Sequence, residues 1–106
     1  MGHIGRDRSI ITLQILYFLD NRRVNDNESI SAYQLINKFN LSNYKNLNSF
    51  LDPMIKLNQI KSEQKPLPGK PENEMGNYYY IIENGIEFVK QTKRILTKQF
   101  DIKEIR

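Results

Sequence analysis

Two helical patterns follow one another between residues 31 and 57, with almost no chain to separate them. In the first, Ser31 and Gln34 have the spacing of a capping box, in which the Ser hydroxyl accepts the N–H of Gln34 and the Gln side chain reaches back. Asn40 tolerates the left-handed conformation in which helices end, and we expect Ser42 to cap the second helix. A turn of about three residues therefore joins the two, which predicts a helix-turn-helix arrangement.

The apolar residues of both helices fall on one side, as helices that cover a common core require. On the first helix the inner face consists of Ala32, Leu35, Ile36 and Phe39. On the second it consists of Leu47, Phe50, Leu51, Met54 and Asn58, with Tyr44 and Leu57 at its edges. The opposite face carries Lys45, Ser49, Asp52 and Lys56, flanked by Asn46 and Asn48. Pro53 cannot donate to the Ser49 carbonyl, so this helix either kinks or restarts with Asp52 as a cap.

The remaining segments complete a recognisable order of elements. Residues 6–21 form an apolar helix that Asp7 or Ser9 can cap, and a polar link over 22–28 leads to a very short strand around Ile30. Residues 59–64 and 78–82 are strand-like, the Pro- and Gly-rich segment 65–77 is a loop, and a helix begins near residue 86. This order predicts an α+β, mostly α fold: a winged helix-turn-helix with a three-helix core, a two-stranded wing and an added C-terminal helix. We expect residues 6–83 to form the winged-helix domain and 84–106 a dimerisation helix.

Composition excludes most catalytic chemistry. The chain has one His, close to its start, and no Cys, so it offers neither a central general base nor a thiolate. No Gly-rich phosphate loop follows a strand, and the acidic residues of the 65–77 loop provide too few ligands for a metal. We expect no enzyme, no cofactor and no metal site. Because no apolar run is long enough to span a bilayer, we expect a soluble cytoplasmic protein without a membrane partner.

The polar face of the second helix in the helix-turn-helix is made of residues that form helices poorly. Asn and Ser cost a few tenths of a kcal/mol each relative to Ala, but Asn can bind adenine edges and Lys can bind guanine or phosphate. We therefore favour nucleic-acid contact over an ordinary polar surface. With two lysines of the 65–77 loop, the predicted DNA-binding residues are Ser42, Asn43, Tyr44, Lys45, Asn46, Asn48, Ser49, Lys56, Lys65 and Lys70.

The C-terminal helix has two adjacent apolar stripes, although one stripe is enough to cover a small domain. One contains Ile86, Val89, Leu96 and Phe100, and the other contains Phe88, Thr92, Ile95 and Ile102. A symmetric homodimer is the commonest way to cover a second stripe; the alternative is that both stripes cover the same core. The predicted dimerisation residues are Ile86, Val89, Lys93, Leu96 and Phe100.

Three segments together resemble the small archaeal winged helix-turn-helix DNA-binding proteins: "RDRSIITLQIL", "LSNYKNLNSFLDPMIKLNQI" and "YYYIIENGIEFVKQTKRI". That family shows an R-x-x-I-I-x-x-I-L opening, an L-S-Y-x-x-L recognition helix and a Y-x-I-T-x-x-G-x-x-F-L ending. This chain departs from the pattern at the inserted Asn43, at Pro53 and in a longer wing. The resemblance implies a dimeric DNA-binding protein of the regulator or chromatin-like type, in some relatives joined by a C-terminal coiled coil.

The sequence thus predicts a protein whose partners are double-stranded DNA and a second copy of itself. We expect a homodimeric transcriptional regulator that places its third helix in the major groove and its wing on the backbone. Two alternatives stay open: an architectural DNA binder without sequence preference, and a winged helix that binds another protein.

Overall fold

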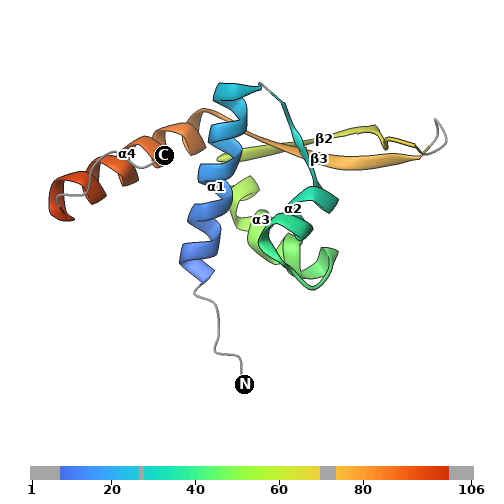
Figure 1. Cartoon of the computed structure of the whole chain (residues 1–106), viewed down its shortest axis with the longest axis horizontal. Helices are drawn as coiled ribbons and strands as arrows, with labels where there is room; N and C mark the ends of the chain where they lie inside the picture. Colours follow the sequence, from blue (N-terminus) through green and yellow to red (C-terminus); the bar gives the residue numbers. More distant parts are fainter. Residues whose placement is uncertain (1–7, 27, 70–73, 101–106) are drawn as a thin grey trace, which may run out of the picture.

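The computed structural model describes residues 8–26, 28–69 and 74–100, with side chains as far as residue 95. In this part of the chain the elements follow the predicted winged-helix order (Figure 1). They are α1 (Arg8–Asn25), β1 (Ile30–Ser31), α2 (Ala32–Phe39), α3 (Tyr44–Lys56), β2 (Ile60–Pro66), β3 (Met75–Ile81) and α4 (Glu83–Phe100). The strands form an antiparallel sheet in the order β1-β3-β2. The predicted fold class is confirmed.

The first helix is longer than the sequence suggested. We expected residues 22–28 to be a polar link, but α1 continues to Asn25. Arg22 pairs with Asp26 one turn later (3.2 Å), and Arg23 pairs with Asp20 (2.8 Å), so ion pairs along the helix surface support the extra turn. Basic residues are also favourable in the last turn of a helix. Of the two expected caps, Ser9 lies inside the helix and Asp7 lies outside the described residues.

The helix-turn-helix forms as predicted at its first end and differs at its second. Ser31 Oγ accepts the N–H of Gln34 (3.1 Å) and Gln34 Oε1 accepts the N–H of Ser31 (3.0 Å), while Asn40 is left-handed at φ 55°. The cap of α3, however, is Asn43 and not Ser42. Asn43 Oδ1 accepts the N–H of Asn46 at 2.8 Å, which shows that the turn uses one more residue than expected.

One hydrophobic core lies between the three helices of the winged-helix body and the sheet. Its largest fully buried side chains are Ile15, Leu16, Leu19, Ile30, Leu35, Leu47, Leu51, Met54, Ile60 and Val89. The predicted inner face of α3 is buried at Leu47, Phe50, Leu51 and Met54. Asn58 does not belong to that face, because α3 ends at Lys56 and Asn58 is left-handed in the turn to β2. Although Pro53 lies inside α3, no second helix starts at Asp52.

The strands of the wing are longer than expected, because part of the segment 65–77, which we expected to be a loop, belongs to them. Lys65 pairs with Gly76 and Pro66 pairs with Met75, so both strands extend into the segment that we expected to be a loop. Leu67 continues the pairing, because its N–H donates to the Glu74 carbonyl at 3.1 Å. The side chain of Leu67 occupies the space that a Cβ at Gly76 would need. Figure 1 shows this hairpin extending away from the helices on the side opposite α4.

The last helix begins one residue after β3. The N–H of Ile82 donates to the Gln59 carbonyl (3.0 Å), and the N–H of Ile86 donates to the Ile82 carbonyl (2.9 Å). Val89 is buried in the core and Ile86 packs against it, so the first turns of α4 are fixed to the body. In the described residues, no helix combines the length and apolar character needed to cross a lipid bilayer.

Candidate nucleic-acid interface

The N-terminal turn of α3 is held by its own asparagines. Asn43 Oδ1 accepts the N–H of Asn46, and Asn46 Oδ1 accepts the N–H of Ser42 at 3.3 Å. Both amide oxygens are therefore occupied, and a bidentate contact with adenine needs the amide oxygen and the amide nitrogen together. Asn43 and Asn46 are better suited to donate from Nδ2 to a phosphate or a base acceptor than to recognise adenine.

The next turn contains side chains that are not engaged in this way. Tyr44, Lys45 and Asn48 are all exposed, and none of their side chains has a hydrogen bond or ion pair with another residue that the structure describes. Asn48 keeps both its amide oxygen and its amide nitrogen for a ligand, and no carboxylate of the described residues pairs with the Lys45 ammonium. These two residues carry the polar chemistry expected of a recognition helix.

Ser49 lies one turn further on and contacts α1. Its hydroxyl donates to the Asn46 carbonyl at 2.6 Å. One terminal nitrogen of the Arg8 guanidinium donates to both the carbonyl and the hydroxyl of Ser49, each at 3.1 Å. Ser49 is thus a structural link within the polar face, and its hydroxyl is less available to a base than we expected. Arg8 is a residue of this surface to which sequence reasoning gave no role.

Lys56 is exposed but is separated from the residues near Lys45. At 1.5 Å per residue, the two lysines lie roughly 16 Å apart along the helix axis. Asp52, with a carboxylate on the exposed side, lies between them. The two lysines therefore lie at separate points along the exposed face of α3.

The wing contributes less free charge than the sequence suggested. Lys65 Nζ donates to Ser29 Oγ (3.0 Å), lies 4.0 Å from Glu63 and sits 4.9 Å from the centre of the Tyr78 ring. Its ammonium is drawn back onto the sheet, beside the chain that leads into β1. Lys70, the other predicted wing contact, lies outside the described residues. The remaining basic residue of β2 is Lys61, which is exposed.

Between the wing and the helix-turn-helix lies a groove of about 260 Å³. Tyr33, Tyr44 and Met75 line it and are 64%, 56% and 46% exposed. Sequence reasoning missed Tyr33 and Met75, although Tyr33 could have been found as the aromatic residue outside the apolar face of α2. Exposed aromatic and thioether groups beside a polar helix can contact sugars and thymine methyl groups.

Other charged groups of the body do not add to this surface. Arg22 and Arg23 are paired with Asp20, Asp26 and Glu28. Burial raises the pKa of Tyr79, with a further contribution from the Asp52 carboxylate, and burial also raises the pKa of Tyr17. Over the described ranges, no group of three or more His, Cys, Asp or Glu side chains could hold a metal ion.

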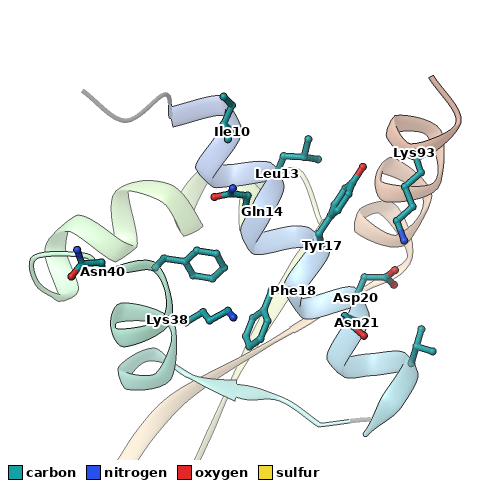
Figure 2. Close-up of a pocket in the computed structure, with 12 residues that line it drawn as sticks. Ile10, Leu13, Gln14, Tyr17, Phe18, Asp20, Asn21, Lys38, Asn40 and Lys93 are labelled. Carbon is teal, nitrogen blue, oxygen red and sulfur yellow. The ribbon is translucent and has the colours of Figure 1, made fainter. Parts of the chain in front are cut away.

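A second surface combines α1 with α4. Figure 2 shows Lys93 of α4 extending toward Tyr17 of α1, with its Nζ 5.4 Å from the ring centre. They border a groove of about 760 Å³ that follows the outer side of α1 and reaches the end of α2. There Phe18 and Phe39 meet edge to face at 5.8 Å. Ile10 and Val24, also on this groove, are 55% and 64% exposed.

The two apolar stripes of α4 have different surroundings. Val89 is only 1% exposed and Ile86 packs on the core, so the stripe that we assigned to dimerisation begins in the body of its own domain. Phe88 and Ile95, on the other stripe, are 44% and 52% exposed. The side chains of Leu96 and Phe100 lie outside the described residues.

Comparison with known proteins identifies the fold. No protein-family model matches the chain, and no curated protein matches its sequence. The structure is similar to a PadR-like transcriptional regulator from Bacillus cereus, with a TM-score of 0.67, 20% identity and coverage of 89% of this chain and 87% of that one. It is also similar to a PadR family transcription regulator from Clostridium difficile (TM-score 0.60, 17% identity, 87% and 98% covered). A Streptococcus transcriptional regulator matches with a TM-score of 0.62 at 15% identity, over 89% and 91% of the two chains.

These likenesses establish a winged-helix fold of the kind that transcriptional regulators use. They extend nearly the full length of each regulator, so α4 is part of the shared architecture and not an addition peculiar to this chain. The sequence motifs indicated a small archaeal family. These structural likenesses support winged-helix regulators in general and do not single out that family.

Proposed function

We propose that this protein is a homodimeric, cytoplasmic transcriptional regulator that binds double-stranded DNA through the N-terminal half of α3. The observation that carries the proposal is the pair of unengaged side chains, Lys45 and Asn48, on the exposed face of the second helix of a helix-turn-helix. The fold shared with transcriptional regulators supports it. Lys45 supplies affinity through phosphate or guanine, and Asn48 supplies base preference through adenine.

The wing has a supporting role in this proposal. Lys65 is already engaged with Ser29 and Glu63, so it ties the wing to the segment before β1 more than it binds phosphate. The groove lined by Tyr33, Tyr44 and Met75 faces the space between wing and helix. We infer that these side chains pack on the sugar–phosphate backbone beside the major groove, where they add contact area without adding charge.

Titration of duplex DNA at several salt concentrations tests the proposal. Each phosphate contact contributes about 0.9 to the slope of log affinity against log salt. Lys45→Ala therefore weakens binding and lowers the slope by about that amount. Lys90→Ala is the matched control, because Lys90 is an exposed lysine on α4 and its loss removes the same charge from a remote surface. Equal slopes for the two variants would place Lys45 away from the DNA.

Base preference needs a second comparison, between random duplexes and the DNA upstream of the protein's own gene. A regulator binds one of these sequences at least tenfold more tightly, and Asn48→Ala reduces the difference by about 1–3 kcal/mol. Equal affinity for unrelated duplexes makes the protein an architectural DNA binder instead. Failure to bind any duplex at any salt concentration assigns the α3 surface to a protein partner.

We further propose that α4 joins two copies through the stripe that contains Phe88 and Ile95. These side chains are about half exposed, whereas Val89 and Ile86 already serve the core. The exposed Ile10 and Val24 of α1 are further apolar surface, and they line the 760 Å³ groove that α4 borders through Lys93. Burial of such surface is what stabilises symmetric interfaces.

Light scattering measures this directly. Ile95→Glu places a carboxylate in the proposed interface and yields a monomer, because an unpaired charge is costly to bury. Lys90→Glu introduces the same group on a different face of α4 and leaves the dimer intact. If Ile95→Glu stays dimeric with native circular dichroism, the Phe88–Ile95 stripe does not form the interface.

A further inference from the structure

Pro53 removes a hydrogen bond from the middle of α3. In a regular helix the N–H of residue 53 would donate to the carbonyl of residue 49, but proline has no N–H and its ring crowds that carbonyl. An interior proline destabilises a helix when nothing relieves the lost hydrogen bond and the crowding. The helix nevertheless extends from Tyr44 to Lys56. The Ser49 carbonyl therefore needs a donor from outside the helix.

Arg8 is that donor. A terminal guanidinium nitrogen lies 3.1 Å from the Ser49 carbonyl oxygen and 3.1 Å from the Ser49 hydroxyl, so its two N–H groups serve both acceptors. The guanidinium carbon lies 4.0 Å from the centre of the Phe50 ring. This stacking covers one face of a side chain that is otherwise buried in the core. A single residue at the start of α1 thus contacts two consecutive residues of α3.

The contact extends toward the candidate DNA-binding turn. Ser49 Oγ, which accepts from Arg8, donates to the Asn46 carbonyl at 2.6 Å. Asn46 in turn accepts the N–H of Ser42 at 3.3 Å through its side chain. A chain of hydrogen bonds therefore leads from Arg8 through Ser49 and Asn46 to the turn before α3. The geometry couples the first residue of α1 to the end of α3 that carries Lys45 and Asn48.

We propose that Arg8 is a positioning residue for the recognition surface: its guanidinium replaces the N–H that Pro53 lacks and holds α3 at a fixed position on α1. The part of this inference that concerns DNA rests on the proposed function; the part that concerns α3 does not. Arg8 acts through Ser49 and is not itself required to contact DNA. In the rival role, Arg8 uses its remaining N–H groups to bind a phosphate directly.

A double-mutant cycle between Arg8 and Pro53 tests the link without DNA. In Pro53→Ala the new N–H can bond the Ser49 carbonyl, which leaves Arg8 with its hydrogen bond to the Ser49 hydroxyl and the stacking on Phe50. We expect Arg8→Ala to lower Tm by about 6 °C in the natural background and by no more than about half of that in the Pro53→Ala background. An equal loss of Tm in both backgrounds would overturn the proposal. Arg94→Ala, at an exposed arginine of α4, is the control and lowers Tm equally in both.

Duplex binding is then measured for the natural protein, Arg8→Ala, Pro53→Ala and the double variant. These measurements separate the two roles of Arg8. Positioning predicts that Arg8→Ala weakens binding about threefold to tenfold at an unchanged salt slope, and that Pro53→Ala reduces this loss. A salt slope that falls by about one in both backgrounds identifies Arg8 as a phosphate contact and overturns the positioning role. If the natural protein binds no duplex, the proposed function fails, and the Tm cycle alone decides whether Arg8 replaces the missing N–H.

Discussion

The start of α4 offers the sharpest test of how this domain is assembled, through the substitution Gly85→Ala. In an isolated helix this change stabilises, because Ala exceeds Gly by about 1 kcal/mol in helix propensity. In this protein Gly85 is buried against the turn between α3 and β2. A Cβ there would lie 2.6 Å from Ile81 Cγ1 and 3.1 Å from the Gln59 carbonyl carbon, and closer still to the Gln59 carbonyl oxygen.

The magnitude follows from which atoms would have to move. The Gln59 atoms that a Cβ at residue 85 would overlap belong to the backbone carbonyl group. Because this carbonyl oxygen accepts the N–H of Ile82, moving it away from the Cβ strains that hydrogen bond. Overpacking costs about 1–3 kcal/mol, and a weakened hydrogen bond costs about 0.5–1.5 kcal/mol. After the gain of about 1 kcal/mol in propensity, we expect Gly85→Ala to lower the free energy of unfolding by about 2 kcal/mol. For a domain of this size that lowers Tm by roughly 10 °C.

Urea unfolding followed by circular dichroism measures the difference. The matched control is Gly76→Ala, where the added Cβ meets the end of the Leu67 side chain, which can rotate away from a surface hairpin. Gly76→Ala should therefore change the midpoint by less than a third as much. If Gly85→Ala is as stable as the natural protein, α4 does not approach Gln59 as closely as the structure shows.

Two further predictions concern the α3 cap and the buried tyrosine. Asn43→Ala lowers the free energy of unfolding by about 1 kcal/mol, whereas Ser42→Ala leaves it nearly unchanged; equal effects in thermal unfolding would show that Asn43 is not the cap. Burial and the Asp52 carboxylate raise the pKa of Tyr79 above its ordinary value of 10.0. The stability that Tyr79 contributes through this raised pKa is fully present below pH 10.0 and is lost as the pH rises through the folded-state pKa. Tyr79→Phe should flatten the alkaline fall of Tm; a fall of unchanged steepness would exclude Tyr79 as its source.

Much of the architecture could be predicted because local chemistry and tertiary structure agree. Ser31 and Gln34 form a capping box from residue types and spacing alone. Asn40 ends α2 in the conformation that asparagine tolerates best among non-glycine residues. The apolar spacing of α3 identified Leu47 and Leu51 as core residues. In each case the residues of a single helix and its caps are enough to predict the local structure.

One error was local, and the others arose where residues distant in the sequence decide the structure. The end of α1 depends on ion pairs of Arg22 and Arg23, which a composition argument interpreted as a polar link. The stripe of α4 that faces the core depends on how the helix leaves β3, which periodicity cannot specify. The role of Arg8 requires that α1 and α3 be side by side. Pro53 did signal an unpaired Ser49 carbonyl, but only the fold shows the donor.

The single residue between β3 and α4 has a consequence for the proposed DNA-binding dimer. Ile82 is held to Gln59, so the wing, the end of α3 and the start of α4 form one continuous unit. In a dimer joined through α4, the two recognition helices are then set at a fixed separation and phase along the duplex, which must match a whole number of helical turns. Insertion of one residue within the first turn of α4 would rotate the rest of the helix by about 100° relative to the body. Such a variant would bind a different half-site spacing while it retained the same base preference.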